Sequence, residues 1–353
     1  MTESLALGLE TVAKNPLLLL LPLIIDVFLW LGPRLSFRPL INTLSHSIDS
    51  LNPLSLTSAL LVLNLGFPVW SHQQIWDPLV PSLAEISEGS TSDVTRDLES
   101  LSQSAPDQYL NVLMPSMVAG HDAKSLPFDY IPPVWQIQTP FEAAALRMGL
   151  FLIGLVFWTI YLAIVSQWVR EGQTNIGWIA RRVPLILLQL VFVLIMVGVA
   201  IFMLALVLSA VEMLSSLVGI TGIAGFLLLL VILVGSWVAM FAAFTLHGMY
   251  MNDRNVFTAA WDSLRVVQWN VSSTMGLILV ILILLTAMQY IKGWLDAGSW
   301  LMAVGIAANA FLCTGLLAAT FVFFKDRYRY WRELREELLA ELERRRTEKS
   351  KSS

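Results

Sequence analysis

The chain has 353 residues, of which 56% are hydrophobic and only 14% are charged, and its formal net charge is −4. A soluble domain carries roughly 25% charged residues, so this composition excludes an ordinary soluble protein. The slightly acidic balance, without a broad basic face, also argues against a nucleic-acid partner.

An apolar segment lies near the N-terminus, at 16–32, and contains Asp26. A cleaved signal peptide would have a basic start and a cleavage site with small residues. Residues 1–15 instead hold Glu3 and Glu10 against Lys14, and no such cleavage pattern follows. We therefore predict that residues 1–32 form an N-terminal segment and a first, uncleaved transmembrane helix.

The segment 33–142 is the largest polar part of the chain, with eleven acidic and four basic residues. We predict an extracytoplasmic loop region that contains three kinds of structure. Residues 53–68 are apolar but bracketed by prolines, which favours a re-entrant or interfacial helix over a span. Residues 86–108 are polar and predict a solvated helix or a partly disordered stretch. Residues 127–140 are rich in proline and predict an extended connector near the membrane interface.

Five long stretches contain no Asp, Glu, Lys, Arg or His, and each exceeds the 18 residues that indicate a membrane-spanning helix. They are 148–169, 183–211, 213–246, 266–291 and 297–324. Barrel strands would alternate in polarity, whereas these runs are uniformly apolar. Residues 143–324 are therefore predicted to form a five-helix transmembrane region. With the first span, the chain is predicted to be an all-α integral membrane protein with a six-helix transmembrane bundle.

Basic residues predict the orientation of these spans, because cytoplasmic loops are enriched in Lys and Arg. If both termini are cytoplasmic, sixteen of the 22 basic residues lie inside and six lie outside. The six outside are Arg34, Arg38, Arg96, Lys124, Arg147 and Lys292. We therefore predict a multi-pass protein of the cell (plasma) membrane with cytoplasmic N and C termini, although Arg34 and Arg38 oppose this orientation.

The C-terminal residues 325–353 are predicted to form a cytoplasmic charged helix. A narrow stripe and three pairs at i, i+4 spacing support a helix. The stripe is Trp331, Leu334, Leu338 and Leu342, and the pairs are Arg329–Glu333, Arg332–Glu336 and Glu341–Arg345. Its early basic and aromatic residues suit contact with anionic lipid. We favour a solvated helix that enforces topology, and a short pairing with a second chain is a further alternative.

Three segments share one pattern, a short amphipathic stretch directly before an apolar run. They are 4–25, 175–193 and 255–280. In the third, Val256, Ala259, Ala260, Leu264 and Val267 recur at helical spacing. This pattern suggests three repeats of an interfacial helix plus a transmembrane hairpin. Polar flanks that any span requires are the alternative explanation.

The segment NVFTAAWDSLRVVQWN at 255–270, followed by a long apolar run, resembles the repeating element of a bacterial membrane family. That family includes the membrane domain found beside some glycerophosphodiester phosphodiesterases and related stand-alone multi-pass proteins. The resemblance covers roughly 140–330 and implies a helical membrane fold. This chain differs from the family in its large 33–142 region and carries no phosphodiesterase catalytic domain. The resemblance therefore implies no activity and no functional residue.

The chain carries few residues in the patterns of catalytic or metal-binding motifs. His46, His72 and His121 lie in the outer region but lack the i, i+4 spacing that makes a metal motif specific. The chain also lacks a phosphate-binding P-loop and a G-x-S-x-G nucleophile motif. We therefore predict no catalytic residue, no metal site and no cofactor.

Asp26 is the one ionisable residue well inside a predicted span. A carboxylate at mid-bilayer costs about 2.5–3.5 kcal/mol on insertion scales, so it needs a partner or water. Two interpretations stay open. Asp26 lies at the outer interface because the helix ends early, or it pairs with another helix. Arg147 is the candidate partner, because it also falls towards the outer leaflet.

The sequence favours a non-catalytic envelope protein that acts as an assembly, scaffold or lipid-associated factor. A transporter, or a permease subunit that works with partner chains, is the alternative. An integral membrane enzyme ranks third, because no catalytic motif is present. The predicted partners are the lipid bilayer, anionic lipid at the C-terminal helix, and unidentified proteins.

Overall fold

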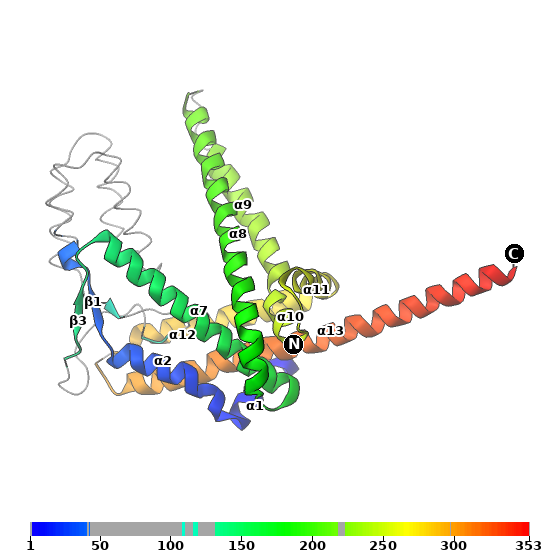
Figure 1. Ribbon diagram of the computed structural model, residues 1–353, viewed down its shortest axis with the longest axis horizontal. Helices are drawn as coiled ribbons and strands as arrows, with labels where there is room; N and C mark the ends of the chain where they lie inside the picture. Colours follow the sequence, from blue (N-terminus) through cyan, green and yellow to red (C-terminus); the bar gives the residue numbers. More distant parts are fainter. Residues whose placement is uncertain are drawn as a thin grey trace. The chain divides into compact units, whose positions relative to one another are not determined.

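The computed structural model describes residues 2–40, 42, 108–109, 116–118, 131–217, 223–296 and 298–352, and nearly all of them are helical (Figure 1). Five helices are long and apolar enough to cross a membrane. They are Pro140–Glu171, Ile176–Val211, Gly225–Met251, Val271–Trp294 and Leu301–Glu337. A sixth span is reached if the bent pair Thr2–Lys14 and Pro16–Leu31 counts as one. The prediction of a multi-pass all-α membrane protein is confirmed.

The N-terminal segment consists of α1 (Thr2–Lys14), a 3-10 turn (Pro16–Leu19) and α2 (Leu20–Leu31). Pro16 explains the break after α1, because proline has no amide hydrogen and disfavours helix at the preceding residue. The remaining helices are α7 (Pro140–Glu171), α8 (Ile176–Leu217), α9 (Ile223–Ala242), α10 (Thr245–Met251), α11 (Val256–Trp269), α12 (Val271–Trp294) and α13 (Leu301–Ser352).

The suggested repeat is visible at two of its three places. Both α1 and α11 are separate short helices that precede an apolar segment. The second place differs, because α8 runs from Ile176 to Leu217 as one helix. Pro184 lies inside α8 without dividing it into an interfacial helix and a span.

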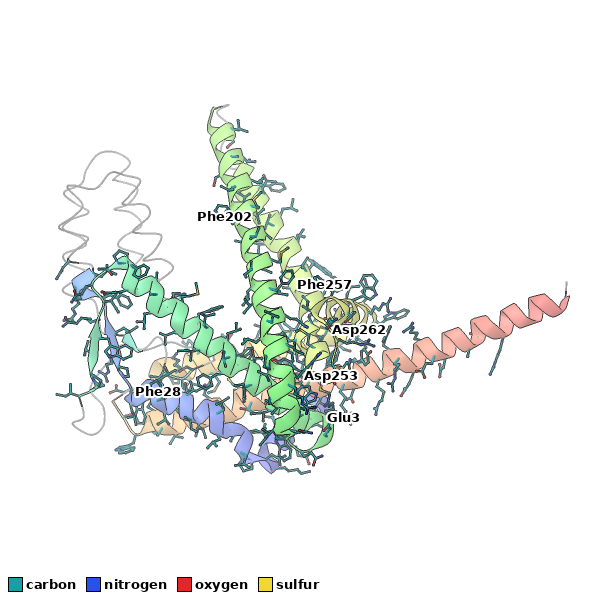
Figure 2. All side chains as sticks on the ribbon, in the orientation of Figure 1. Glu3, Phe28, Phe202, Asp253, Phe257 and Asp262 are labelled. Atoms are coloured by element: carbon teal, nitrogen blue, oxygen red, sulfur yellow. The ribbon has the colours of Figure 1, made fainter. Side chains whose placement is uncertain are left out.

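The chain divides into two compact units, and α7, α12 and α13 contribute residues to both. Unit 1 comprises Met1–Leu18, Thr159–Leu284 and Thr314–Ser353. Within it, α8 packs along α9, and α11 packs against α9 and α10. Apolar side chains that face outward, such as Phe202, cover the α8–α9 hairpin (Figure 2). Such a surface suits direct contact with lipid tails.

The interior of unit 1 is built around His247 on α10. The Phe321 ring lies 4.4 Å from its imidazole, and the rings of Phe244 and Phe324 lie 5.2 and 5.9 Å away. The Nε2 atom of His247 lies 2.8 Å from the hydroxyl of Thr320. Aromatic packing and this hydrogen bond hold α10 against α13.

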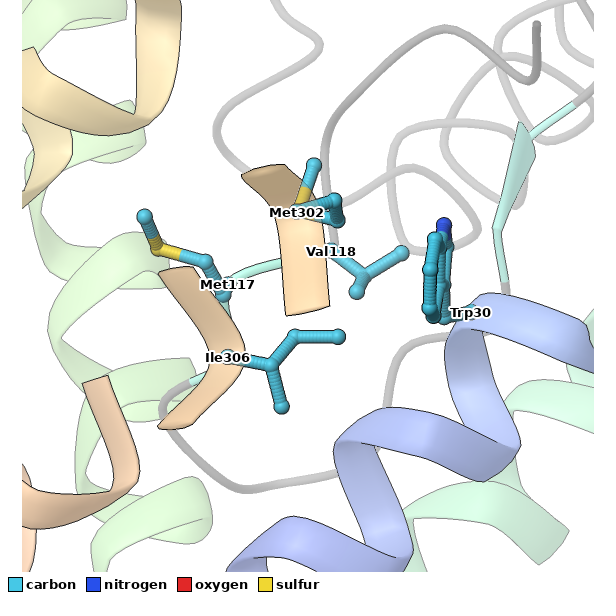
Figure 3. Packing of buried hydrophobic residues seen from close by; sticks show 5 residues of the cluster. All are labelled: Trp30, Met117, Val118, Met302 and Ile306. Carbon is cyan, nitrogen blue, oxygen red and sulfur yellow. The ribbon is translucent and has the colours of Figure 1, made fainter. Parts of the chain in front are cut away.

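Unit 2 comprises Leu19–Trp158 and Leu285–Cys313. Its core is a cluster of Trp30, Met117, Val118, Met302 and Ile306, in which side chains from α2 and α13 enclose two residues of the outer region (Figure 3). The described part of that outer region also forms a small sheet, which the sequence did not predict. Its strands are β1 (Arg34–Ser36), β2 (Gln108–Tyr109) and β3 (Val134–Gln136).

The sheet has the order β2-β1-β3, with β1 antiparallel to β2 and parallel to β3. In this register Leu35 lies opposite both Gln108 and Trp135. The extended conformation predicted for 127–140 is confirmed at β3. The predicted helix at 53–68, most of the polar stretch 86–108, and the three outer histidines His46, His72 and His121 lie outside the described residues.

Candidate functional site

Asp26 is buried in α2, with 3% of its surface exposed. Its Oδ2 atom accepts a hydrogen bond from the backbone amide of Met117 at 3.1 Å. The side chains of Ser116 and Asn309 also hydrogen-bond to this carboxyl group, and Lys292 supplies a nearby positive charge. We call Asp26, Ser116, Lys292 and Asn309 the Asp26 cluster. Asp26 is therefore buried and hydrogen-bonded to other segments of the chain, whereas its pairing with a basic residue stays a prediction.

The Asp26 cluster holds the backbone of residues 116–118 from two sides. Asp26 accepts from the amide of Met117, and the Nζ atom of Lys292 donates to the carbonyl oxygen of Ser116 at 3.4 Å. The Met117 side chain fits beside Gly305 on α13, where an added Cβ would lie 3.2 Å from its terminal methyl group. Asp26, Lys292 and Gly305 thus hold residues 116–118 of the outer region against the helices of unit 2.

Arg147 is not among the groups that act on the Asp26 carboxyl. The structure therefore gives the candidate pair Asp26–Arg147 no support, and that pairing stays a prediction. Sequence reasoning missed Ser116, Lys292 and Asn309 as members of the cluster. Lys292 did offer a signal, because it ends the charge-free stretch 266–291.

The second candidate site lies in unit 1, where α11 is amphipathic. Its buried face comprises Ala259, Asp262, Ser263, Val266 and Val267. The opposite face exposes Phe257 and Trp261, Trp269 is exposed at the end of the helix, and Figure 2 labels Phe257 and Asp262 on this helix. Only Asn270 separates α11 from α12, which is a candidate span. Exposed aromatic side chains directly before a span are typical of a helix that lies at the membrane interface.

Two arginines, one on α11 and one on α13, lie over tryptophan rings of these helices. The guanidinium carbon of Arg265 lies 5.1 Å from the centre of the Trp261 ring and 5.5 Å from that of Trp331. The guanidinium of Arg335 lies 5.7 Å from the same Trp331 ring. We call Trp261, Arg265, Trp331 and Arg335 the interface surface. It joins α11 to the part of α13 that follows the last apolar run.

Asp262 is the acidic residue beside the interface surface. Its Oδ2 atom lies 3.9 Å from the Nε atom of Arg254. Burial raises the pKa of the Asp262 carboxyl, and the charges of Arg254, Arg265 and Arg335 act in the opposite direction. Three arginines therefore surround one acid, which leaves an excess of positive charge.

The loop before α11 is fixed by a second group of charges. Asp253 lies 3.5 Å from both Arg170 on α7 and Arg182 on α8. It has a φ of 53°, a left-handed conformation that aspartate tolerates better than most residues. Arg182 also donates to the carbonyl oxygen of Arg254 at 3.0 Å. These contacts position the start of α11 and hence the interface surface.

The pKa of Asp262 yields a test of this geometry. An acid with a raised pKa in the folded state binds its proton more tightly there than in the unfolded state. The stability that this proton contributes is therefore fully present below the unfolded pKa of about 4 and is lost as the pH rises through the folded pKa. We expect wild-type protein to lose thermal stability relative to Asp262→Asn as the pH rises from 4 to 7 in detergent. A difference that moves in the opposite direction would contradict a raised pKa.

Comparison of the chain with family models, with curated proteins and with solved structures finds no match. The resemblance to the membrane domain of glycerophosphodiester phosphodiesterases therefore stays a prediction. Within the described residues, the side chains that carry information about function are those of the Asp26 cluster and the interface surface. The chain that bears them is a multi-pass α-helical membrane protein.

Proposed function

We propose that this protein is a non-catalytic integral protein of the cell membrane, with both termini cytoplasmic, that acts in the envelope as a lipid-associated assembly or scaffold factor. The interface surface carries this proposal. It combines an amphipathic helix, exposed aromatic residues and an excess of arginine, which together favour contact with a membrane face. A site of this kind binds and positions the protein, and it needs no reacting group.

The division into units supports the proposed orientation. Every described base assigned to the inside by the sequence falls in the residue ranges of unit 1, including Arg170, Arg182 and Arg265. The described bases assigned to the outside fall in the ranges of unit 2, and these are Arg34, Arg38, Arg147 and Lys292. The two units thus contain the same two sets of bases that the charge pattern assigns to opposite sides of the membrane, which favours the proposed orientation.

Reporter fusions test the topology. We expect a reporter placed at Ser90, in the 33–142 region, to be extracytoplasmic, and a reporter at Ser353 to be cytoplasmic. A phosphatase that is active only outside and a fluorescent protein that is active only inside would give opposite signals at the two positions. Finding both positions on the same side of the membrane would defeat the six-span topology.

A transporter or permease subunit is the second candidate function, and the Asp26 cluster is the observation that favours it. Ionisable residues within spans often mark a substrate or proton pathway, and Asp26 and Lys292 lie close enough to interact. Purification in mild detergent separates the two candidates. A copurifying ATPase would support the permease subunit, whereas envelope assembly proteins without an ATPase would support the scaffold.

A further inference from the structure

We propose that the interface surface binds the phosphate group of an anionic phospholipid through Arg265 and Arg335. This inference rests on the proposed lipid-associated function and names the ligand of that same site. The sequence predicted lipid contact along the C-terminal helix, and this proposal places that contact at the interface surface between α11 and α13. The ligand chemistry is a phosphate ester that carries net negative charge.

The first observation that supports phosphate binding is that Arg265 and Arg335 have unused N–H donors within the described part of the chain. Among the described residues, neither Arg265 nor Arg335 forms an ion pair or donates a hydrogen bond. Each guanidinium has five N–H donors, and its planar fork matches a phosphate group. The contacts of both side chains are to tryptophan rings, which hold the cations in place without using those donors.

Two other arginines of α13, Arg329 and Arg332, have acidic partners, whereas Arg327 lies over the Phe323 ring. Arg329 lies 4.0 Å from both Asp326 and Glu333, and Arg332 lies 4.0 Å from Glu336. The predicted pairs Arg329–Glu333 and Arg332–Glu336 are thereby confirmed, and the charges of these arginines are balanced within α13. Arg254 likewise has Asp262 as its partner. Arg265 and Arg335 instead lie over tryptophan rings and feel the charge of Asp262 without an ion pair to it, so among the described residues their N–H donors stay available to a phosphate.

The position of the site along α13 is the second reason. The last charge-free stretch ends at residue 324, so Trp331 lies about 10 Å beyond it at 1.5 Å per residue. Helical side chains point towards the N-terminus, so Arg335 reaches back to the level of Trp331. The headgroup region extends roughly 5–8 Å beyond each side of the hydrocarbon core. Arginine side chains at this level can reach lipid phosphates by snorkelling.

The amphipathic helix supplies the third reason. Phe257 and Trp261 are exposed on α11, with 73% and 55% of their surfaces accessible. Aromatic side chains of this kind insert at the boundary between headgroups and acyl chains. Trp261 contacts Arg265 directly, so the aromatic anchor and the cation are parts of the same surface. A soluble phosphate ion would use only the cations and leave the aromatic residues in water.

The experiment compares two charge-matched variants of the full chain in detergent. Arg265→Gln/Arg335→Gln removes both guanidinium groups of the interface surface. Arg329→Gln/Arg332→Gln removes the same charge from arginines that have acidic partners. Thermal unfolding is followed by circular dichroism during titration with phosphatidylglycerol, phosphatidylcholine or inorganic phosphate. The lipid concentration at half-maximal stabilisation reports the apparent affinity.

We expect phosphatidylglycerol to stabilise the wild-type protein more than phosphatidylcholine does. Each arginine near an anionic surface contributes about 1 kcal/mol, or about fivefold in affinity. The Arg265→Gln/Arg335→Gln variant should therefore bind phosphatidylglycerol about 25-fold more weakly, and the control variant should stay within about twofold of wild type. If the double variant does not fold, each single variant should lose about fivefold, and Arg265→Lys/Arg335→Lys should bind more weakly than wild type because lysine keeps the charge without the planar fork.

Three results would overturn the proposal. Equal stabilisation of the wild type by both lipids would remove the anionic preference. An equal loss in the Arg329→Gln/Arg332→Gln control would show a general charge effect. Stabilisation by inorganic phosphate as strong as that by phosphatidylglycerol would show that a free anion, not a lipid, occupies the site. A copurifying ATPase would defeat the scaffold function separately, because it would leave the measured lipid preference unchanged.

Discussion

Replacing Asp26 with leucine is expected to lower the free energy of unfolding by about 3–5 kcal/mol, because the buried carboxyl is a hydrogen-bond partner of Met117, Ser116 and Asn309, and losing such a partner costs about 1–3 kcal/mol per buried polar group. The variant would leave Lys292 without its acid and the amide of Met117 without its acceptor. Asp26→Asn should cost less, because its amide oxygen can still accept from Met117. Chemical unfolding of the detergent-solubilised protein would measure both losses.

A double-mutant cycle identifies the partner of Asp26. We expect Asp26→Leu/Lys292→Met to be more stable than the sum of the two single effects predicts, because it removes both charges together. A parallel cycle with Asp26→Asn and Arg147→Gln decides whether Arg147 shares in the pair, as the sequence suggested. Strictly additive effects in both cycles would show that Asp26 acts only through its hydrogen bonds to residues 116–118 and Asn309.

The consequence of losing Asp26 reaches beyond α2. Met117 and Val118 belong to the outer region, yet they are almost fully buried beside Trp30, Met302 and Ile306. The carboxyl group of Asp26 is one of two contacts that hold this backbone in place, and the other is the hydrogen bond from Lys292 to Ser116. We therefore expect the Asp26→Leu variant to expose the outer region near residue 117 to protease while the reporter at Ser353 stays cytoplasmic.

The long apolar elements could be predicted from the sequence because each carries its own signal. A stretch such as 183–211 has no charged residue and is too long for anything but a span. The boundaries were less predictable, since α8 continues through Glu212 to Leu217. The three strands left no trace, because two or three residues are too few to show alternation. They form only because distant segments pair.

In both candidate sites, the sequence could indicate single residues but not the contacts between residues that lie far apart in the chain. Asp26 stood out because it is charged inside an apolar run, so its need for a partner could be predicted. Its partners could not, because Met117 lies 91 residues further along the chain, and Lys292 reaches Ser116 across 176 residues. In the interface surface, Trp261 and Arg265 are four residues apart on one helix and could have been recognised. Trp331 joins them only through the packing of α13 in unit 1.

Helix α1 docks on α13 at a place that tolerates no side chain. Ser4, Gly8 and Val12 recur every four residues and form the buried face of α1. A Cβ added at Gly8 would overlap the backbone of Ala319, and one added at Gly315 would overlap Leu9. Glycines on both helices therefore allow the close approach, as small residues do at helix contacts in membranes.

Gly8→Ala is accordingly expected to lower the free energy of unfolding by about 1–3 kcal/mol, because a backbone cannot move aside as a flexible side chain can. Gly198→Ala in α8 is the matched control, since an added Cβ there meets nothing within 4 Å. The control should be neutral, or more stable by up to about 1 kcal/mol, because alanine favours helix over glycine.

Limited trypsin digestion provides a second readout of the same contact. If Gly8→Ala releases α1 from α13, cleavage after Lys14 should become faster in the variant than in the wild type or the control. A Gly8→Ala protein with wild-type stability and unchanged cleavage would show that α1 does not pack on α13 through Gly8. Because α1 precedes the first span, its attachment to α13 links the N-terminal segment to the helix that carries Trp331 and Arg335.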